Sequence, residues 1–339
     1  MGRAKALIRS EPPSAEQWQT PLLNVFLGNS LEFYKNWKQP DTIVSDGAYG
    51  ILGFEGDTCT HQGLGEWYEP HIAAWASRAT AKTTLWFWNS EIGWASVHPV
   101  LERYGFRYVN ANVWNKGLAH IAGNVHTSKI RRFPVVTELC VQYCFEAKIK
   151  GLPLKQWLLS EWKRSGLPLY SANTACGIKN AATRKYLDQG YLWYWPPIEM
   201  FGRLRDYANF HGKPEGRPYF SSDGIRPISD EQWAATRSKF KCPHGHTNVW
   251  SRPPLSGRER IRLPKGKAIH LNQKPIDLMK LIIEASTEEG DIVWEPFGGL
   301  FTASLAAAQL GRQSFGCEID PTYFHYGLER LREAFASAE

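Results

Sequence analysis

The sequence predicts an α/β layer fold of alternating strands and helices. Residues 20–150 alternate short apolar runs of strand length with stretches whose apolar residues have helical spacing, and residues 267–339 do the same. Residues 151–266 lack this alternation and are rich in Pro, Trp, Tyr and basic residues. We therefore expect one layered domain built from the two outer stretches, with the middle stretch inserted between them.

The first stretch begins the alternation. Each expected strand is a short apolar run, and each expected helix has apolar residues at every third or fourth position. The first helix follows a turn whose Ser30 is a residue type that caps helices. In order along the chain, the expected elements are strand 22–26, helix 31–37, strand 42–45, helix 67–79, strand 83–88, helix 93–104 and strands 106–114 and 135–145.

The alternation returns in the second stretch. A glycine pair, Gly298–Gly299, forms a turn between a strand and a helix rich in Ala and Leu. The expected elements are helix 272–285, strand 291–294, helix 302–310, strand 313–319 and helix 323–335. The second stretch therefore has the strand, turn, helix, strand order of an α/β unit.

The charge balance favours a polyanionic partner. The chain has 339 residues, with 40 Lys and Arg against 33 Asp and Glu, which gives a net charge of +7. Eight basic residues and one acid lie between residues 239 and 267. A phosphate backbone is the natural partner of such a local excess, although a solvated charged surface is the default explanation.

The sequence contains no pattern typical of a membrane span, a secreted chain or a metal centre. Apolar runs are shorter than the roughly 18 residues of a spanning helix, and the N-terminal residues lack an apolar signal segment. The six cysteines form no CxxC pair, and the loop of Cys242, His244 and His246 has no second ligand pair nearby. We therefore expect a cytoplasmic protein that needs no metal.

A loop suited to an adenosine cofactor follows the strand expected at 291–294. It contains Glu295 and Gly298–Gly299, and Glu318 stands at the tip of the next strand. Glycines let the backbone approach a ligand, and an acid at that tip accepts hydrogen bonds from ribose hydroxyls. Because GxGxxG is absent, a cofactor without pyrophosphate is favoured, such as S-adenosylmethionine, whose amine can pair with Glu295. On the glycine pair alone, a simple strand-to-helix turn would be the better interpretation.

Three motifs follow one another at this end of the chain. Residues 270–275 read HLNQKP, residues 295–302 read EPFGGLFT, and residues 316–323 read GCEIDPTY. In this order and spacing they resemble the HPTQKP, DPFxGxGT and GxEIDxxY motifs of the amino-directed DNA methyltransferases of bacteria and phages, which modify N6 of adenine or N4 of cytosine. The chain departs from these motifs at Leu271-Asn272, in place of Pro-Thr, at Glu295, in place of Asp, and at Phe301, in place of the last Gly. It resembles the permuted subgroup, in which the catalytic motif comes first and the cofactor motif last.

The resemblance implies a Rossmann-like S-adenosylmethionine-dependent methyltransferase sheet with an inserted target-recognition region. Residues 20–150 and 267–339 would form the catalytic domain, and residues 151–266 the region that binds DNA. The cofactor residues implied by the motifs are Asn29, Asn272, Lys274, Glu295, Phe297, Gly299, Thr302 and Glu318.

The catalytic motif of the family is Asp, Ser or Asn followed by two prolines and an aromatic residue, and Asp46-Gly47-Ala48-Tyr49 resembles it without the prolines. A base amine is conjugated with its ring and is a poor nucleophile. Two acceptors for its hydrogens, the Asp46 side chain and the Gly47 carbonyl, would favour a free lone pair. Tyr49 would stack on a base swung out of the duplex. Without the prolines, surrounding residues must hold the loop rigid.

The implied activity is methyl transfer to adenine N6 or cytosine N4 of double-stranded DNA, with a restriction endonuclease as a possible partner. Two alternatives stay open. One is a catalytically weakened methyltransferase fold that binds DNA, and the other is an RNA methyltransferase, since both nucleic acids are polyanions. The residues expected to contact DNA are Lys179, Arg184, Lys185, Arg258 and Arg260. Surface charge is the competing explanation for them.

Overall fold

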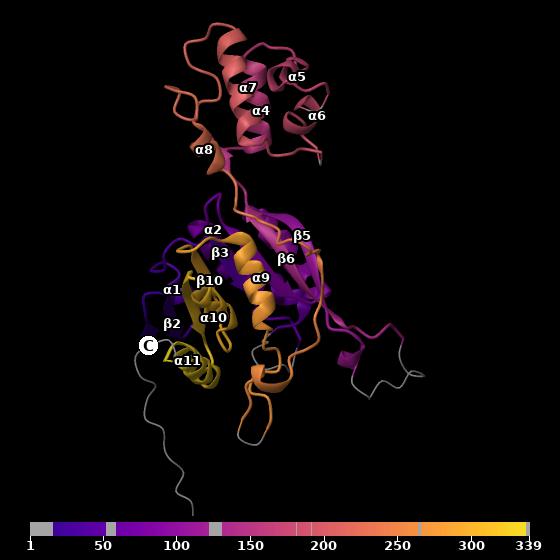
Figure 1. The fold of residues 1–339 in the computed structure, drawn as a ribbon, viewed down its shortest axis with the longest axis vertical. Coiled ribbons are helices and arrows are strands. Elements are labelled where there is room, and N and C mark those ends of the chain that lie inside the picture. The colour runs from indigo at the N-terminus through magenta and orange to yellow at the C-terminus, as the bar shows by residue number, and fades with distance from the viewer. Residues whose placement is uncertain are drawn as a thin grey trace, which may run out of the picture.

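The chain folds around one large sheet that carries helices on both faces (Figure 1). The computed structural model describes residues 16–51, 59–121, 131–180, 182–190, 192–263 and 266–336. Within these residues the sheet has nine strands in the order β1-β2-β11-β10-β3-β4-β6-β5-β9. Their bounds, in sheet order, are Gln17–Gln19, Leu23–Leu27, Gln313–Glu318, Ile292–Glu295, Thr42–Ser45, Thr84–Asn89, Thr137–Phe145, Phe106–Asn115 and Val249–Ser251.

The five central strands β2, β11, β10, β3 and β4 are mutually parallel. Their carboxyl ends therefore meet at one edge of the sheet, where ligands bind in open α/β folds. Antiparallel β6 follows β4 in the sheet, and antiparallel β1 closes the other side on β2. Neither β1 nor β9 was predicted, because each is a three-residue strand that only its pairing partner defines.

Alternate residues of the central strands enter two different cores. Ile43, Leu85 and Phe87 pack toward α2 (Leu64–Arg78) and α3 (Glu91–Arg103), together with α1 (Ser30–Phe33). Their neighbours in sequence pack toward α9 (Ile276–Ser286) and α10 (Thr302–Gln309). The last helix, α11 (Pro321–Ala336), covers β2 beside α10. Burial on both faces explains why these strands are continuous apolar runs.

The middle of the chain forms a helical unit with its own core. Its helices are α4 (Leu154–Arg164), α5 (Ser171–Cys176), α6 (Ala182–Tyr186), α7 (Ile198–His211) and α8 (Asp230–Ala234). They enclose buried aromatic side chains that include Trp157, Trp162, Phe201, Phe220 and Trp233. A short hairpin, β7 (Lys148–Ile149) with β8 (Leu152–Pro153), leads into the unit, which stands at one end of the molecule (Figure 1).

The helical unit is joined to the sheet at the amino ends of the parallel strands. β6 runs antiparallel to β4, so that Cys144 pairs with Thr84 at the start of β4, and the chain then leaves the sheet. It returns at Lys239, which forms ion pairs with Glu288 and Asp291 just before β10. The unit is therefore attached at the edge opposite to the carboxyl ends.

The predicted recognition region of residues 151–266 divides into two parts. Residues 154–234 form the helical unit, whereas Val249–Ser251 forms β9 and pairs with β5 in the large sheet. Three short 3-10 helices lie near the carboxyl edge, at His61–Gly63, Leu118–Ile121 and Gly257–Glu259. In the part of the chain that the structure describes, we find no helix of the length and apolarity needed to cross a membrane.

Candidate functional site

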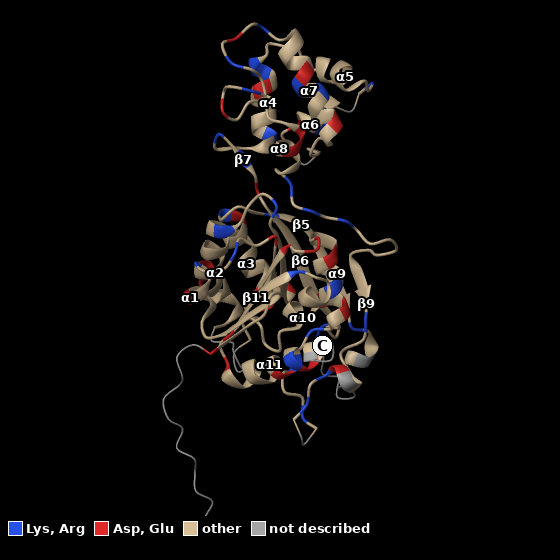
Figure 2. Cartoon of the chain, turned by 60° about the vertical axis from the view of Figure 1, so that its left-hand side comes forward, with Lys and Arg blue, Asp and Glu red and all other residues tan. Residues whose placement is uncertain are grey.

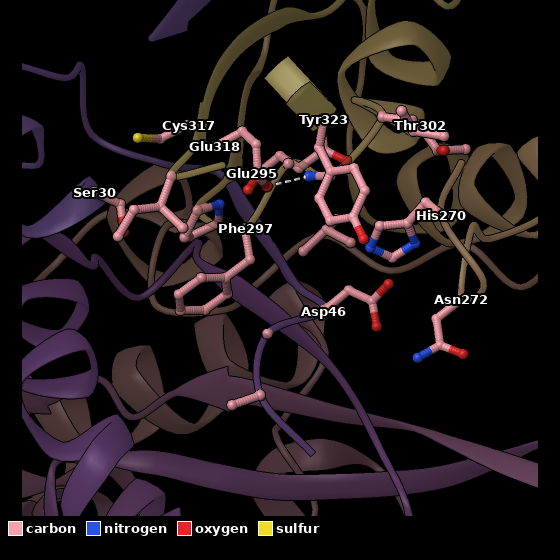
Figure 3. Close-up of a pocket in the computed structure, with 18 of the residues that line it drawn as sticks. Ser30, Asp46, His270, Asn272, Glu295, Phe297, Thr302, Cys317, Glu318 and Tyr323 are labelled. Carbon is pink, nitrogen blue, oxygen red and sulfur yellow. Dashed lines mark hydrogen bonds between the residues drawn. The ribbon is translucent and has the colours of Figure 1, made fainter. Parts of the chain in front are cut away.

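A cavity of about 390 Å³ opens at the carboxyl ends of β2, β11, β10 and β3. This volume falls within the range of roughly 300–1,000 Å³ typical of small-molecule sites. The loops after these four strands line it, together with the segment before α9 and the start of α11. Figure 3 shows Glu295, Glu318, His270, Tyr323 and Asp46 around it. Every predicted cofactor and catalytic residue lies on its wall, namely Asn29, Asp46, Gly47, Tyr49, Asn272, Lys274, Glu295, Phe297, Gly299, Thr302 and Glu318.

The Glu295 carboxylate caps the helix that follows it. Its Oε1 accepts a hydrogen bond of 2.8 Å from the backbone N–H of Ala303, and its Oε2 accepts one of 2.7 Å from Ser304. Burial raises the pKa of this carboxyl to about 7, against the opposing effect of these hydrogen bonds. Both oxygens thus help to shape the loop, and each retains a second lone pair. The pairing of Glu295 with the amine of the cofactor stays a prediction.

The Glu318 carboxylate is held by backbone groups at the tip of β11. The N–H of Gly299 donates to Oε2 at 2.6 Å, and the N–H of Asp320 donates to Oε1 at 2.8 Å. Gly299 has φ +51°, a conformation that favours glycine. Each carboxylate oxygen retains a second lone pair that can accept from a ligand hydroxyl. The predicted position of Glu318 beside the glycine turn is therefore what the structure shows.

Phe301 explains why the last motif glycine is absent. Its φ is +53°, as at a glycine, which costs an L-residue roughly 1–2 kcal/mol. The side chain is fully buried, and its ring lies where Cβ atoms on Gly298, Gly316 and Gly327 would be. A phenyl ring surrounded by three glycines fills this space, and its burial offsets the backbone strain.

The cavity has features that fit an adenosine cofactor. The Nδ1 of His270 is buried and, among the described atoms, lacks a hydrogen-bond partner, as expected where a ligand supplies one. Burial lowers the pKa of His270 to about 4, so the ring is neutral at pH 7. The rings of Tyr323 and Phe297 add flat apolar surface to the wall. Asn29 also caps α1, because its Oδ1 accepts from the N–H of Leu31.

Asp46 stands at the end of β3 in a group of buried charges. The Nζ of Lys274 lies 2.6 and 2.8 Å from its two carboxylate oxygens, and the Tyr49 hydroxyl lies 2.9 Å from Oδ1. The same hydroxyl is 2.5 Å from Oε1 of Glu138. Lys274, predicted as a cofactor residue, therefore directs its ammonium at the catalytic loop. The hydroxyl of Tyr49 is likewise engaged, while its ring lines the cavity.

Neighbouring side chains hold the catalytic loop in place of the missing prolines. The carbonyl of Ala48 accepts hydrogen bonds from the Tyr68 hydroxyl at 3.1 Å and from Nδ2 of Asn89 at 3.0 Å. A Cβ on Gly47 would lie 2.6 Å from the Tyr68 oxygen and 2.7 Å from the Phe297 ring. Glycine at 47 is thus required by close packing, and the loop gains its rigidity from two long-range hydrogen bonds.

Sequence reasoning missed Glu138 and also Lys116, which pairs with it in addition to Lys274. The Nζ of Lys116 lies 2.8 Å from Oε2 of Glu138, and that of Lys274 lies 3.0 Å from Oε1. Burial raises the pKa of Glu138, but the two ammonium groups outweigh it and bring the pKa to about 2. One signal was available, since Glu138 is the single charged residue in the strand Thr137–Phe145.

The residues predicted to contact DNA do not gather at the cavity. Lys179, Arg184 and Lys185 are exposed on the helical unit, which is attached at the opposite sheet edge and mixes acids with bases (Figure 2). Arg260 donates to the backbone carbonyls of Leu255, His270 and Leu271 and so braces the segment before α9. The side chain of Arg258 lies outside the described residues.

Some of the basic side chains between residues 239 and 267 form ion pairs within the protein. Lys239 pairs with Glu288 and Asp291, and Arg252 pairs with Glu259 and Asp277. Counting charges along the sequence could not reveal this, because three of the four acids lie beyond the segment. Lys241 and Lys267 remain exposed.

Comparison with known proteins identifies the family. The family model for N6 and N4 DNA methylases matches residues 40–329. The chain belongs to this DNA methylase family. This confirms the resemblance that the three motifs indicated, whereas membership of the permuted subgroup stays a prediction.

Curated relatives match parts of the chain. The Type II methyltransferase M.HinfI of Haemophilus influenzae is 38% identical over 86 residues, which are 25% of this chain and 24% of that protein. The Type II methyltransferase M1.MboII of Moraxella bovis is 31% identical over 187 residues, 54% of this chain and 65% of that protein. The matches thus span less than two thirds of the length of these relatives.

A solved structure supports the fold. The PvuII DNA methyltransferase (cytosine-N4-specific) superposes with a TM-score of 0.54 and 12% identity, over 94% of this chain and 92% of that one. At this identity the likeness concerns the fold alone. It confirms the predicted Rossmann-like methyltransferase sheet.

Proposed function

We propose that the chain is an S-adenosylmethionine-dependent DNA amino-methyltransferase that acts on adenine N6 or cytosine N4. The observation that carries the proposal is the common cavity of Asp46 and Glu318, which stand at the ends of different strands of one parallel sheet. Glu318, Gly299, Phe297, Tyr323 and Thr302 would hold the cofactor. When bound there, S-adenosylmethionine supplies the methyl carbon, and its sulfur keeps the bonding electrons.

The catalytic loop would prepare the base amine for attack. The Asp46 carboxylate and the Gly47 carbonyl accept the two amine hydrogens, so that the nitrogen lone pair is released from conjugation and can be directed at the methyl group. No covalent bond between base and enzyme is needed, and no cysteine has to act as a nucleophile. The base must leave the duplex to reach the cavity, which requires unstacking.

The DNA partner would approach the carboxyl edge of the sheet. Two basic side chains in the segment before α9, Arg262 and Lys267, are exposed at that edge. The family and the Type II names of the relatives support DNA as the substrate, and pairing with a restriction endonuclease is part of the proposal.

The test combines purified chain and methyl-labelled S-adenosylmethionine with mixed-sequence duplex DNA, and with RNA in parallel. After digestion, label in N6-methyladenine or N4-methylcytosine nucleosides from DNA would support the proposal and identify the base. Label from RNA alone would replace it with the RNA alternative. Absence of label, with cofactor binding retained, would favour the weakened DNA-binding alternative. Asp46→Ala serves as the inactive control in each arm.

A further inference from the structure

The charges around Asp46 form a closed and balanced group. Asp46 and Glu138 are the two carboxylates, and Lys274 and Lys116 are the two ammonium groups. Titratable groups lie around the catalytic loop on several elements: Tyr49 on the loop, Tyr68 and His71 on α2, Lys116 after β5, Glu138 and Cys140 on β6, His270 and Lys274 before α9, and Glu295 after β10.

Lys274 is the member that joins the two carboxylates. Its side chain is 2% exposed, and its Nζ lies within 3.0 Å of oxygens of both Asp46 and Glu138. The Tyr49 hydroxyl lies 3.2 Å from the same Nζ and sits between the same two acids. The ammonium is therefore committed to this group.

Two buried carboxylates so close together cannot both stay ionised unaided. Like charges in a shared site force one of them to take up a proton, whereas an opposite charge within hydrogen-bond distance favours ionisation. Burial raises the pKa of Asp46, and the Lys274 ammonium opposes this more strongly than any other neighbour. A protonated Asp46 would present a hydroxyl donor where the reaction needs an acceptor.

Asp46 is turned partly into the cavity while Lys274 is not. The Asp46 side chain is 19% exposed, and Figure 3 shows it at the wall that Tyr323 and His270 share. Ionised carboxylate oxygens have more lone pairs than Lys274 and Tyr49 occupy, so acceptor sites remain for a base amine. The pairing therefore orients the Asp46 carboxylate without occupying all of its acceptor sites.

We infer that Lys274 is a positioning residue, which holds Asp46 ionised and oriented as an amine acceptor by bridging it to Glu138. The inference rests on the proposed function, and it replaces the cofactor role that the motif implied for Lys274. The role of Glu138 is to anchor the ammonium, and Lys116 neutralises Glu138 from the other side.

The test is the pH dependence of methyl transfer to DNA for Lys274→Met, with wild type and Lys280→Met as references. Lys280 lies on α9, outside the charge group, and offers the same substitution. We expect the acidic limb of kcat/KM to move up by about one to three pH units in Lys274→Met, the usual effect of an opposite charge on a carboxylate. S-adenosylmethionine affinity, measured by calorimetry, should stay within threefold of wild type.

Two further variants keep the test decisive if Lys274→Met folds poorly. Lys274→Arg keeps the charge and should restore the acidic limb toward wild type. Lys274→Met combined with Glu138→Gln removes one charge of each sign and should also return the limb toward wild type.

The outcomes separate the inference from the function on which it rests. An unchanged pH profile with weakened cofactor binding would indicate that Lys274 binds the cofactor, and would overturn the inference. A limb that stays shifted in the double variant would overturn the role of Glu138. A wild type without methyl transfer to DNA at any pH would instead overturn the proposed function.

Discussion

The three acidic loops of the cavity are built in two contrasting ways. After β10 and β11, Glu295 and Glu318 accept hydrogen bonds from backbone N–H groups within about twenty residues of themselves. After β3, Asp46 is neutralised by Lys274, 228 residues away, and shares Tyr49 with Glu138. The geometry of the cofactor loops is therefore fixed by nearby backbone. The geometry of the catalytic loop is fixed by side chains from four other parts of the chain, namely Tyr68, Asn89, Glu138 and Lys274.

The two kinds of loop should tolerate different sequence changes. A carboxylate bound by backbone groups depends on the local chain path, so its motif tolerates Glu for Asp and Phe for Gly. A carboxylate bound by side chains depends on partners that a motif does not contain. Substitutions in the catalytic loop should therefore have greater effects on the reaction than substitutions in the cofactor loops.

The substitution Asp46→Ala should remove the side-chain acceptor, while the hydrogen bonds of Tyr68 and Asn89 to the Ala48 carbonyl still hold the loop. We expect methyl transfer to fall at least about 100-fold, the size of effect seen when one precisely aimed polar group is removed from a reaction centre. Cofactor affinity should stay unchanged in calorimetry, because the backbone-bound loops are untouched. Loss of both activity and cofactor affinity would mean that the two loops are not independent.

Restoring the family residue with Gly47→Pro should impair the enzyme. A side chain at 47 meets the Tyr68 oxygen and the Phe297 ring at 2.6 and 2.7 Å, so the loop must move. A displacement near 1 Å costs about 100-fold in rate. Gly216→Ala, where an added Cβ meets nothing within 4 Å, is the control and should leave kcat unchanged. A faster Gly47→Pro enzyme would show that the loop lacks rigidity as it stands.

Glu318→Gln should weaken cofactor binding about tenfold, since it removes the charged acceptor for ligand hydroxyls and loosens the Gly299 hydrogen bond. Calorimetry with S-adenosylmethionine measures this effect directly. The kcat at saturating cofactor should change little, because Asp46 keeps its partners. Unchanged affinity would remove Glu318 from the cofactor site.

Glu138→Gln should change how stability depends on pH. The folded pKa of Glu138 is about 2, below its ordinary 4.5, so its ionised form stabilises the fold above pH 4.5, and this contribution is lost as the pH falls toward 2. The gap in urea midpoint between wild type and variant should therefore be larger at pH 7 than at pH 3.5. An equal gap at both pH values would contradict the ion pairing of Glu138.

The sequence predicted most of the sheet and the cofactor loops for the same reason. Strands such as Thr84–Asn89 are apolar on both faces, and the order strand, glycine turn, helix is written in contiguous residues. Helix α9 begins at Ile276 rather than 272, because Pro275 lacks an N–H and occupies the cap position. Strand β9 was missed, since three residues carry no periodicity.

Neighbouring residues encode the α/β order, the family motifs and the positions of Asp46, Glu295 and Glu318 at strand ends, so local patterns were enough to predict them. Three features are visible only in the folded chain. Lys274 pairs with Asp46, Tyr68 and Asn89 hold the loop that lacks the two prolines, and the helical unit joins the sheet at the edge opposite to the cavity. The physical reason is that these features depend on pairings between distant segments, which strand order and burial fix and which local patterns do not contain.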